Sequence, residues 1–136
     1  MSLLDADAVN RFLAEAFPGA RGDLPGVVAL EPGLARLQLH ADASHMRPGN
    51  MVSGPTQMTL ADTAAYVCVF TRAGLEPMAV TSSLDMHFLR PCIGPVVTVE
   101  ARMLRFGRKL AVMDVRVFGE GHEDPSAAAI VSYARP

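Results

Sequence analysis

The stretch PTQMTLADTAAYVCVF, residues 55–70, contains a single charged side chain, Asp62. A helix at a protein surface shows a charged stripe, but this stretch is apolar nearly all round. It therefore predicts a helix buried inside its own protein, with Gly74 placed to end it. The stretch is too short and too interrupted by Thr and Gln to span a membrane. A carboxylate buried in such a helix needs a hydrogen-bonding partner or a chemical role.

The composition predicts one domain with an aliphatic core. The chain has 136 residues, of which 50% are apolar, and it contains no Trp. This length fits a single domain over residues 1–136. The formal net charge of −2 gives no electrostatic reason to expect nucleic acid or an anionic membrane as a partner.

Cysteines, histidines and the first residues favour a cytoplasmic protein without a metal. Cys68 and Cys92 stand in apolar surroundings without metal-type spacing, which is typical of buried thiols in a reducing compartment. The start, MSLLDADAVNRF, has acids where a signal peptide needs bases. The four histidines show no helical ligand spacing, so we expect no metal, and nothing in the chain requires a cofactor.

Apolar periodicity predicts an α+β fold in the order helix, two strands, buried helix, four strands. The first helix is expected over residues 4–17, and a turn-rich loop over 41–50 precedes the buried helix. The predicted strands cover residues 27–30, 34–40, 79–89, 96–106, 110–118 and 127–133. One curved antiparallel sheet of these six strands, wrapped around the central helix, would bury that helix.

Ser53, Gly54 and Pro55 stand just before the central helix. Ser53 suits the N-cap, and Pro55 suits the first turn, where its missing N–H costs nothing. Gly54 leaves its backbone N–H open at the positive end of the helix dipole, where a polarised carbonyl oxygen or an oxyanion would be stabilised. A well-capped helix start without chemistry is the alternative interpretation.

The spacing of Gly54 and Asp62 has a consequence for quaternary structure. They are eight positions apart in the sequence, which is about 12 Å along a helix that rises ~1.5 Å per residue. A nucleophile or base and its oxyanion donor must both lie about 3 Å from one reacting atom. If both residues act, they come from two subunits whose helices run antiparallel across a two-fold axis, so a catalytic role predicts an obligate homodimer.

Three runs, HMRPGNMVSGPTQMTLADTAAY, TSSLDMHFLRP and LRFGRKLAV, resemble the hotdog-fold thioesterase superfamily. The likeness is greatest to its phenylacetate-degradation (PaaI-like) acyl-CoA thioesterase branch, and it extends from about residue 34 to 133. It rests on the spacing of Gly54 and Asp62, which have seven residues between them and a Leu-Ala-Asp at the end, and on the Phe-Leu-Arg-Pro that closes the next strand. The resemblance implies a hotdog fold with an added N-terminal helix, and hydrolysis of an acyl-CoA to free acid and coenzyme A.

The resemblance also implies roles for individual residues. The Gly54 amide would polarise the thioester carbonyl, and Asp62 would act as nucleophile or general base. Thr81 would orient the water or the carboxylate, and Asn50 would contact the reacting group. Members of the family usually carry His-Gly-Gly where this chain has residues 53–55, so no imidazole is expected there. We expect a reduced rate or an altered substrate choice at a site that still works.

Other residues are expected to contact the substrate. Basic side chains at strand ends would meet the phosphates of coenzyme A, and flexible or flat apolar side chains would line the acyl pocket. The alternatives are that the basic residues belong to solvated turns and that the apolar residues belong to the ordinary core. The candidates are Ser53, Pro55, Met58, Tyr66, Ser82, Arg90, Arg105, Gly107, Arg108 and Lys109, with Met51 and Phe70 as further pocket residues.

Two other functions stay open at this level. His45-x-x-Pro48-Gly49 resembles a loop of fatty-acid dehydratases, whose histidine shares proton transfer with a helix acid. Asp62 follows His45 by seventeen positions, which is a longer spacing than that pattern expects. The serine at position 53 also leaves room for a non-catalytic acyl-CoA-binding protein. The acyl group, small or medium and aromatic or aliphatic, stays open, as does the choice between a dimer and a dimer of dimers.

Overall fold

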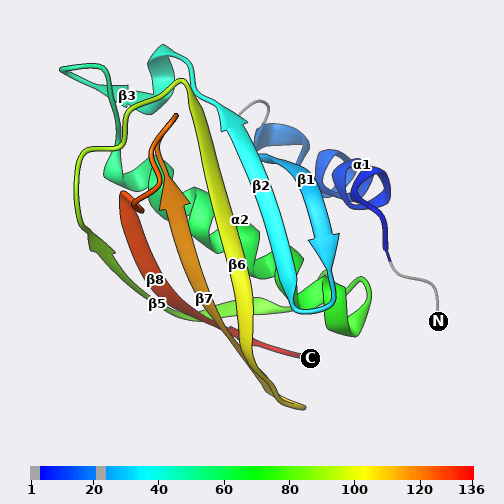
Figure 1. The fold of residues 1–136 in the computed structure, drawn as a ribbon. Coiled ribbons are helices and arrows are strands. Elements are labelled where there is room, and N and C mark those ends of the chain that lie inside the picture. The colour runs from blue at the N-terminus through cyan, green and yellow to red at the C-terminus, as the bar shows by residue number, and fades with distance from the viewer. Residues whose placement is uncertain (1–3, 21–23) are drawn as a thin grey trace.

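The computed structural model describes residues 4–20 and 24–136, so residues 1–3 of the start discussed above lie outside it (Figure 1). Six strands form one antiparallel sheet in the order β1-β2-β6-β7-β8-β5, and this sheet curves around α2. The arrangement is the hotdog architecture that the resemblance implies. The elements are α1 (Ala6–Ala16), β1 (Gly26–Glu31), β2 (Leu34–His40), β3 (Met46–Arg47), β4 (Met51–Val52), α2 (Gly54–Ala73), β5 (Val80–Phe88), β6 (Val96–Phe106), β7 (Leu110–Phe118) and β8 (Ala127–Ala134).

The predicted order of elements is confirmed, with ends that differ by at most two residues. α1 begins later than predicted because Asp5 caps it, accepting a hydrogen bond from the Ala8 N–H at 2.7 Å. The turn-rich loop predicted over 41–50 contains two elements that were not predicted. That stretch holds a 3₁₀ turn and the first strand of the short pair β3–β4. Gly49 and Asn50, with φ of 93° and 58°, make the tight turn of this pair, because both residue types tolerate left-handed backbone.

α2 forms the centre of the core, as predicted. Ser53 caps it, and Gly74 at φ 81° ends it. Eleven of its residues are buried, but one stripe is not. Pro55, Met58 and Thr59 are exposed and Asp62 is half-buried, and their spacing of three and four places them on one helix face. The prediction of a helix buried all round is therefore wrong for this stripe, because the sheet of one chain leaves that face open.

Inward-facing side chains alternate along the last three strands and pack on α2. Fully buried residues of this kind, such as Val99, Met113 and Val131, each contribute about 1.5–3 kcal/mol of transfer free energy on folding. In β8 the inward row ends at Tyr133, which lies opposite Thr81 of β5. The register of β5 shifts between Thr81 and Ser83, so a bulge lies at Ser82.

β5 is an edge strand of the sheet. Within residues 4–20 and 24–136 no other strand pairs with its outer side, whereas the opposite edge, β1, has α1 packed beside it (Figure 1). Val80 and Phe88, near the two ends of β5, are 58% and 51% exposed. An unpaired edge with exposed apolar side chains is a surface onto which another chain can add.

Candidate active site

Asp62 is held by two hydroxyl groups. Its Oδ1 accepts a hydrogen bond from Thr81 Oγ1 at 2.6 Å and another from Tyr133 Oη at 2.8 Å. The prediction that Asp62 is buried is wrong for the single chain, since the residue is half-buried at the wall of a pocket. Thr81 thus contacts the carboxylate directly, and the orienting role that the resemblance gives it stays a prediction.

Tyr133 is a site residue that the sequence analysis missed. The alternation of inward and outward residues along β8 indicates that Tyr133 faces inward. That it meets Asp62 depends on how α2 lies across the sheet. Burial raises the pKa of the Tyr133 hydroxyl above its ordinary value, and the nearby Asp62 charge adds to this. The hydroxyl therefore keeps its proton and donates to the carboxylate.

A pocket of about 490 Å³ lies beside Asp62. Tyr66 forms part of its wall, with its hydroxyl donating to the Pro77 carbonyl at 3.0 Å. Its ring lies 6.1 Å from that of Phe17 and 5.7 Å from that of Tyr133. The mainly apolar lining comprises Leu13, Phe17, Leu24, Thr59, Asp62, Thr63, Tyr66, Pro77, Ala79, Val80, Thr81 and Tyr133. This pocket suits an apolar group whose reactive end meets Asp62.

A second pocket, of about 340 Å³, lies at Gly54. The Gly54 N–H belongs to the first turn of α2, where no carbonyl of the helix can accept it, and no acceptor is found for it among the described residues. Two basic residues, Arg47 and Arg90, line the pocket with Phe88 and Met51. A Cβ at position 54 would lie 3.6 Å from the Phe88 ring. The site can thus offer an N–H donor and positive charge to an oxygen-rich ligand.

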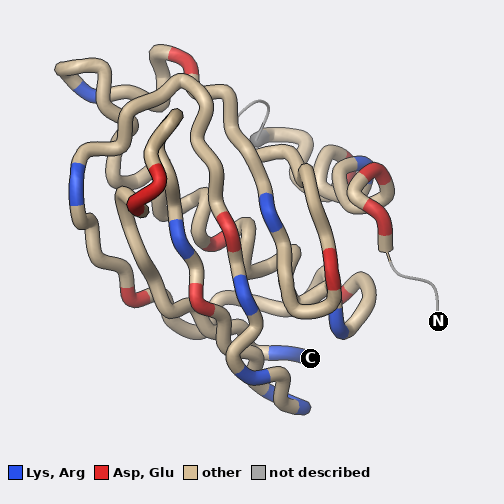
Figure 2. Tube along the Cα trace, viewed as in Figure 1, with Lys and Arg blue, Asp and Glu red and all other residues tan. Residues whose placement is uncertain are grey.

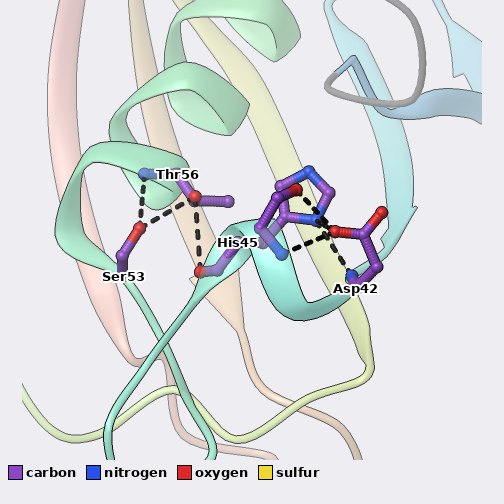
Figure 3. A network of polar contacts seen from close by, with 5 residues as sticks. Asp42, His45, Ser53 and Thr56 are labelled. Atoms are coloured by element: carbon purple, nitrogen blue, oxygen red, sulfur yellow. Dashed lines mark hydrogen bonds and ion pairs between the residues drawn. The ribbon is translucent and has the colours of Figure 1, made fainter.

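A network of polar contacts fixes the start of α2 (Figure 3). The Ser53 hydroxyl accepts from the Thr56 N–H at 3.2 Å and donates to Thr56 Oγ1 at 2.8 Å. The backbone carbonyl of His45 accepts from the Ser53 N–H at 2.9 Å. The buried imidazole of His45 accepts from the Asp42 N–H through Nδ1, also at 2.9 Å. Ser53 is thus the predicted N-cap, and His45 lies in the 3₁₀ turn before β3, joined to Ser53 by a backbone hydrogen bond.

This position of His45 argues against the dehydratase alternative. The imidazole closes its own turn with Asp42, and His45 lines neither the Asp62 pocket nor the Gly54 pocket. The shared proton transfer of a dehydratase would require it beside the helix acid.

One chain does not bring Gly54 and Asp62 together. They line different pockets, about 12 Å apart along α2. The pocket of Asp62 adjoins Thr81 near the start of β5, and the pocket of Gly54 adjoins Phe88 at its end. Seven residues of strand, about 23 Å at ~3.3 Å per residue, separate these two ends.

Other predicted site residues lie outside both pockets. Asn50 makes the β3–β4 turn, so its contact with the reacting group stays a prediction. Ser82 lies at the β5 bulge, and Pro55 and Met58 belong to the exposed stripe of α2. Phe70 is core, at 2% exposure, rather than part of a pocket wall.

The predicted basic residues lie in two places. Arg105, Arg108 and Lys109 are exposed at the β6–β7 hairpin, where basic residues gather in Figure 2. Gly107 has a structural reason to be glycine, because a Cβ there would lie 2.8 Å from the Leu110 carbonyl oxygen. Arg90 is instead part of the Gly54 pocket.

A partly buried ion pair lies beside the basic β6–β7 hairpin and supports it. Arg135 donates to the Gly107 carbonyl at 2.8 Å and pairs with Glu76 at 2.6 Å. Hydrogen bonding to Arg135 holds the pKa of Glu76 below its ordinary value, so the pair is charged. These contacts connect the hairpin to the loop before β5, which contributes Pro77 and Ala79 to the Asp62 pocket.

Within the described ranges, no group of three or more His, Cys, Asp and Glu side chains could hold a metal ion. Both cysteines are buried, and burial raises the pKa of Cys68 to about 12, which keeps that thiol protonated and inert. In the part of the chain that the structure describes, no helix combines the length and apolar character needed to cross a membrane.

Comparison with known proteins identifies the family of this chain. A sequence model described as "Thioesterase superfamily" matches residues 49–126, more than half of the chain and including both Gly54 and Asp62. The chain belongs to the thioesterase superfamily. The likeness seen in the sequence is thereby confirmed at the level of the superfamily.

Three known proteins are similar to this thioesterase-superfamily chain over most of its length. The crystal structure of a "putative thioesterase" from Silicibacter is 37% identical, with a TM-score of 0.89, and the match covers 100% of this chain and 95% of that one. A Bacillus halodurans protein solved with CoA is 26% identical, with a TM-score of 0.69, over 81% of this chain and 72% of that one. A "Putative esterase" of Saccharolobus solfataricus is 29% identical over 74% of this chain.

The aligned stretch spans 66% of the length of the Saccharolobus solfataricus protein. The match to the Silicibacter structure confirms the hotdog fold, with its central helix and N-terminal helix. Family and relatives together support thioester hydrolysis as the activity of this chain.

Proposed function

We propose that this protein is an acyl-CoA thioesterase that works as a homodimer. It would hydrolyse a small or medium acyl-CoA, aromatic acyl groups included, to the free acid and coenzyme A. The observation that carries the proposal is Asp62: a carboxylate held by two hydroxyls at the wall of an apolar pocket, in a chain of the thioesterase superfamily.

The free edge of β5 supports the dimer. Thr81, bonded to Asp62, lies near one end of this strand, and Phe88, next to Gly54, forms the other end. If two β5 edges pair antiparallel around a two-fold axis, the start of one strand lies beside the end of the other. Asp62 of one subunit then approaches Gly54 of the partner subunit. The exposed stripe of α2, which contains Met58 and Asp62, faces the same stripe across the axis.

Each group has a defined task in the composite site. The thioester carbonyl oxygen would accept from the Gly54 N–H of the partner subunit, which favours the charge that develops on that oxygen. The Asp62 carboxylate would attack the carbonyl carbon or take a proton from an attacking water. The carbon–sulfur bond then breaks and coenzyme A leaves. Ser53 would contribute through the cap that aims the Gly54 N–H.

The two pockets suggest how the substrate lies. The acyl group would occupy the apolar pocket beside Asp62 and Tyr66. The same β5 pairing would bring the basic hairpin of one subunit toward Arg90 of the partner subunit, so both could meet the phosphates. The Bacillus halodurans relative solved with CoA supports a coenzyme A ligand.

A panel of acyl-CoA thioesters, assayed by release of free thiol, tests the activity. We expect turnover of at least one short, medium or aromatic acyl-CoA. Binding of acyl-CoA to the full chain without thiol release from any member of the panel would instead establish a non-catalytic binding protein.

Replacement of Met58 by arginine tests the dimer. Met58 is 43% exposed on the stripe of α2 that would face the partner, so Met58→Arg would place two like charges against each other in an apolar contact. We expect a folded monomer by analytical ultracentrifugation, with hydrolysis reduced to background because each site needs two chains. Ile130→Arg, at the same 43% exposure on the outer face of β8, is the matched control and should stay dimeric and active. An active Met58→Arg monomer would contradict the two-chain site.

A further inference from the structure

The two oxygens of the Asp62 carboxylate have different surroundings. Both side-chain hydrogen bonds end at Oδ1, from Thr81 at 2.6 Å and from Tyr133 at 2.8 Å. Across the described residues, no hydrogen bond reaches Oδ2. A carboxylate oxygen accepts through two lone pairs, so Oδ1 is saturated while Oδ2 is open.

We propose that Tyr133 is a positioning residue, which together with Thr81 saturates Oδ1 and leaves Oδ2 as the one oxygen of Asp62 that reacts. The inference rests on the proposed thioesterase function and deepens it. Tyr133 acts through the carboxylate and does not touch the reacting carbon. It holds the rotamer of Asp62 at the wall of the pocket that would receive the thioester, with Oδ2 left without a hydrogen bond from the described residues.

Oδ2 can react either as a base or as a nucleophile. As a base, Oδ2 takes one proton from water while the water oxygen bonds to the carbonyl carbon. The carbon–sulfur bond breaks and the proton passes to the coenzyme A thiolate. As a nucleophile, Oδ2 itself bonds to the carbonyl carbon, and the carbon–sulfur bond breaks so that the thiolate leaves. Water then hydrolyses the resulting anhydride to the free acid and the Asp62 carboxylate, and the proton released in this step passes to the thiolate.

Burial and backbone pairing hold Tyr133 in place beside Asp62. It is 4% exposed, and its ring lies 5.7 Å from the ring of Tyr66. Its backbone is paired with Thr81 on one side and Ala111 on the other. The two donors to Oδ1 therefore come from directly opposite residues of neighbouring strands, so the sheet sets the distance between them. The hydroxyl also lies 3.1 Å from the backbone carbonyl oxygen of Asp62, which ties it to the helix.

Tyr133→Phe removes one oxygen atom and keeps the ring. We expect kcat for the best substrate of the panel to fall at least about ten-fold, because a hydrogen bond to a charged group is lost. KM should stay within about two-fold, since the hydroxyl makes no substrate contact. Removing both donors, in Tyr133→Phe with Thr81→Val, should cost more than either change alone, because both act on the same atom.

Ser132→Ala is the matched control in the same strand. Ser132 is the neighbour of Tyr133, and its side chain belongs to the outer face of the sheet, opposite Ser83 and Val112. We expect wild-type kcat and KM for this variant. Circular dichroism and ultracentrifugation on every variant establish that fold and dimer are kept.

The results distinguish a failure of the role of Tyr133 from a failure of the proposed thioesterase function. Turnover by the wild type with an unchanged kcat in Tyr133→Phe, or a change confined to KM, would overturn the role of Tyr133 alone. Absence of turnover by the wild type across the whole panel would overturn the proposed function, and the role of Tyr133 with it. A fall in kcat at constant KM supports both.

Discussion

Asp62→Asn is expected to abolish thioester hydrolysis, lowering kcat by at least about 10³-fold, as losses of a nucleophile or base commonly do. The amide has the size of the carboxylate and can still accept from Thr81 and Tyr133 through its oxygen. The fold and the dimer should therefore persist. Thiol release, measured with an acyl-CoA that the wild type turns over, gives the result directly.

A second aspartate provides the control for this change. Asp114 lies on β7, away from both pockets, and its side chain contacts Arg116 at 3.4 Å. Asp114→Asn makes the same chemical change there and should leave turnover unaltered. If Asp62→Asn retained more than about a tenth of the wild-type rate, a gap of less than ~1.4 kcal/mol in activation free energy, Asp62 would not be the reacting acid.

Gly54→Pro is expected to lower kcat by about 10²-fold or more, the usual cost of one oxyanion donor. The proline removes the backbone N–H that would contact the thioester oxygen, and it adds a ring at this position. The position tolerates it, because proline suits the first turn of a helix. The preceding Ser53, at φ −68° and ψ 155°, already has the extended backbone that proline demands of its neighbour. Thermal unfolding of this variant and of Gly54→Ala measures what a Cβ costs in stability at a helical residue that precedes Pro55.

Gly54→Ala is the companion variant, since it keeps the N–H and its Cβ makes an ordinary 3.6 Å contact with Phe88. We expect it to lose much less activity than the proline variant. Equal losses in the two variants would mean that space at this position, and not the N–H, is what the reaction needs.

Mixing the two inactive chains tests whether the site is shared between subunits. Asp62→Asn keeps a working Gly54, and Gly54→Pro keeps a working Asp62. Random exchange of subunits makes half of the dimers mixed, each with one intact composite site, so about a quarter of the wild-type activity should return. If each site lay within one chain, no mixture could regain activity.

Much of the fold was predictable from the sequence, because it depends on local periodicity. The alternation along residues 96–106 and 110–118 matched β6 and β7 residue for residue, and Ser53 and Gly74 marked the ends of α2. The pair β3–β4 was missed, since two-residue strands are too short to show alternation.

Only part of the candidate site was predictable from the sequence. The sequence by itself determined that one carboxylate, Asp62, interrupts an apolar helix. It also determined that Gly54 lies too far along the same helix to meet it, because helical rise is fixed per residue. Only the tertiary structure decided that Tyr133, far along the chain from Asp62, donates to that carboxylate, and that Asp62 lies on an open face of α2. Which strand lies at the edge of a sheet, and which of its residues meets a helix, depends on long-range pairing that no local pattern encodes.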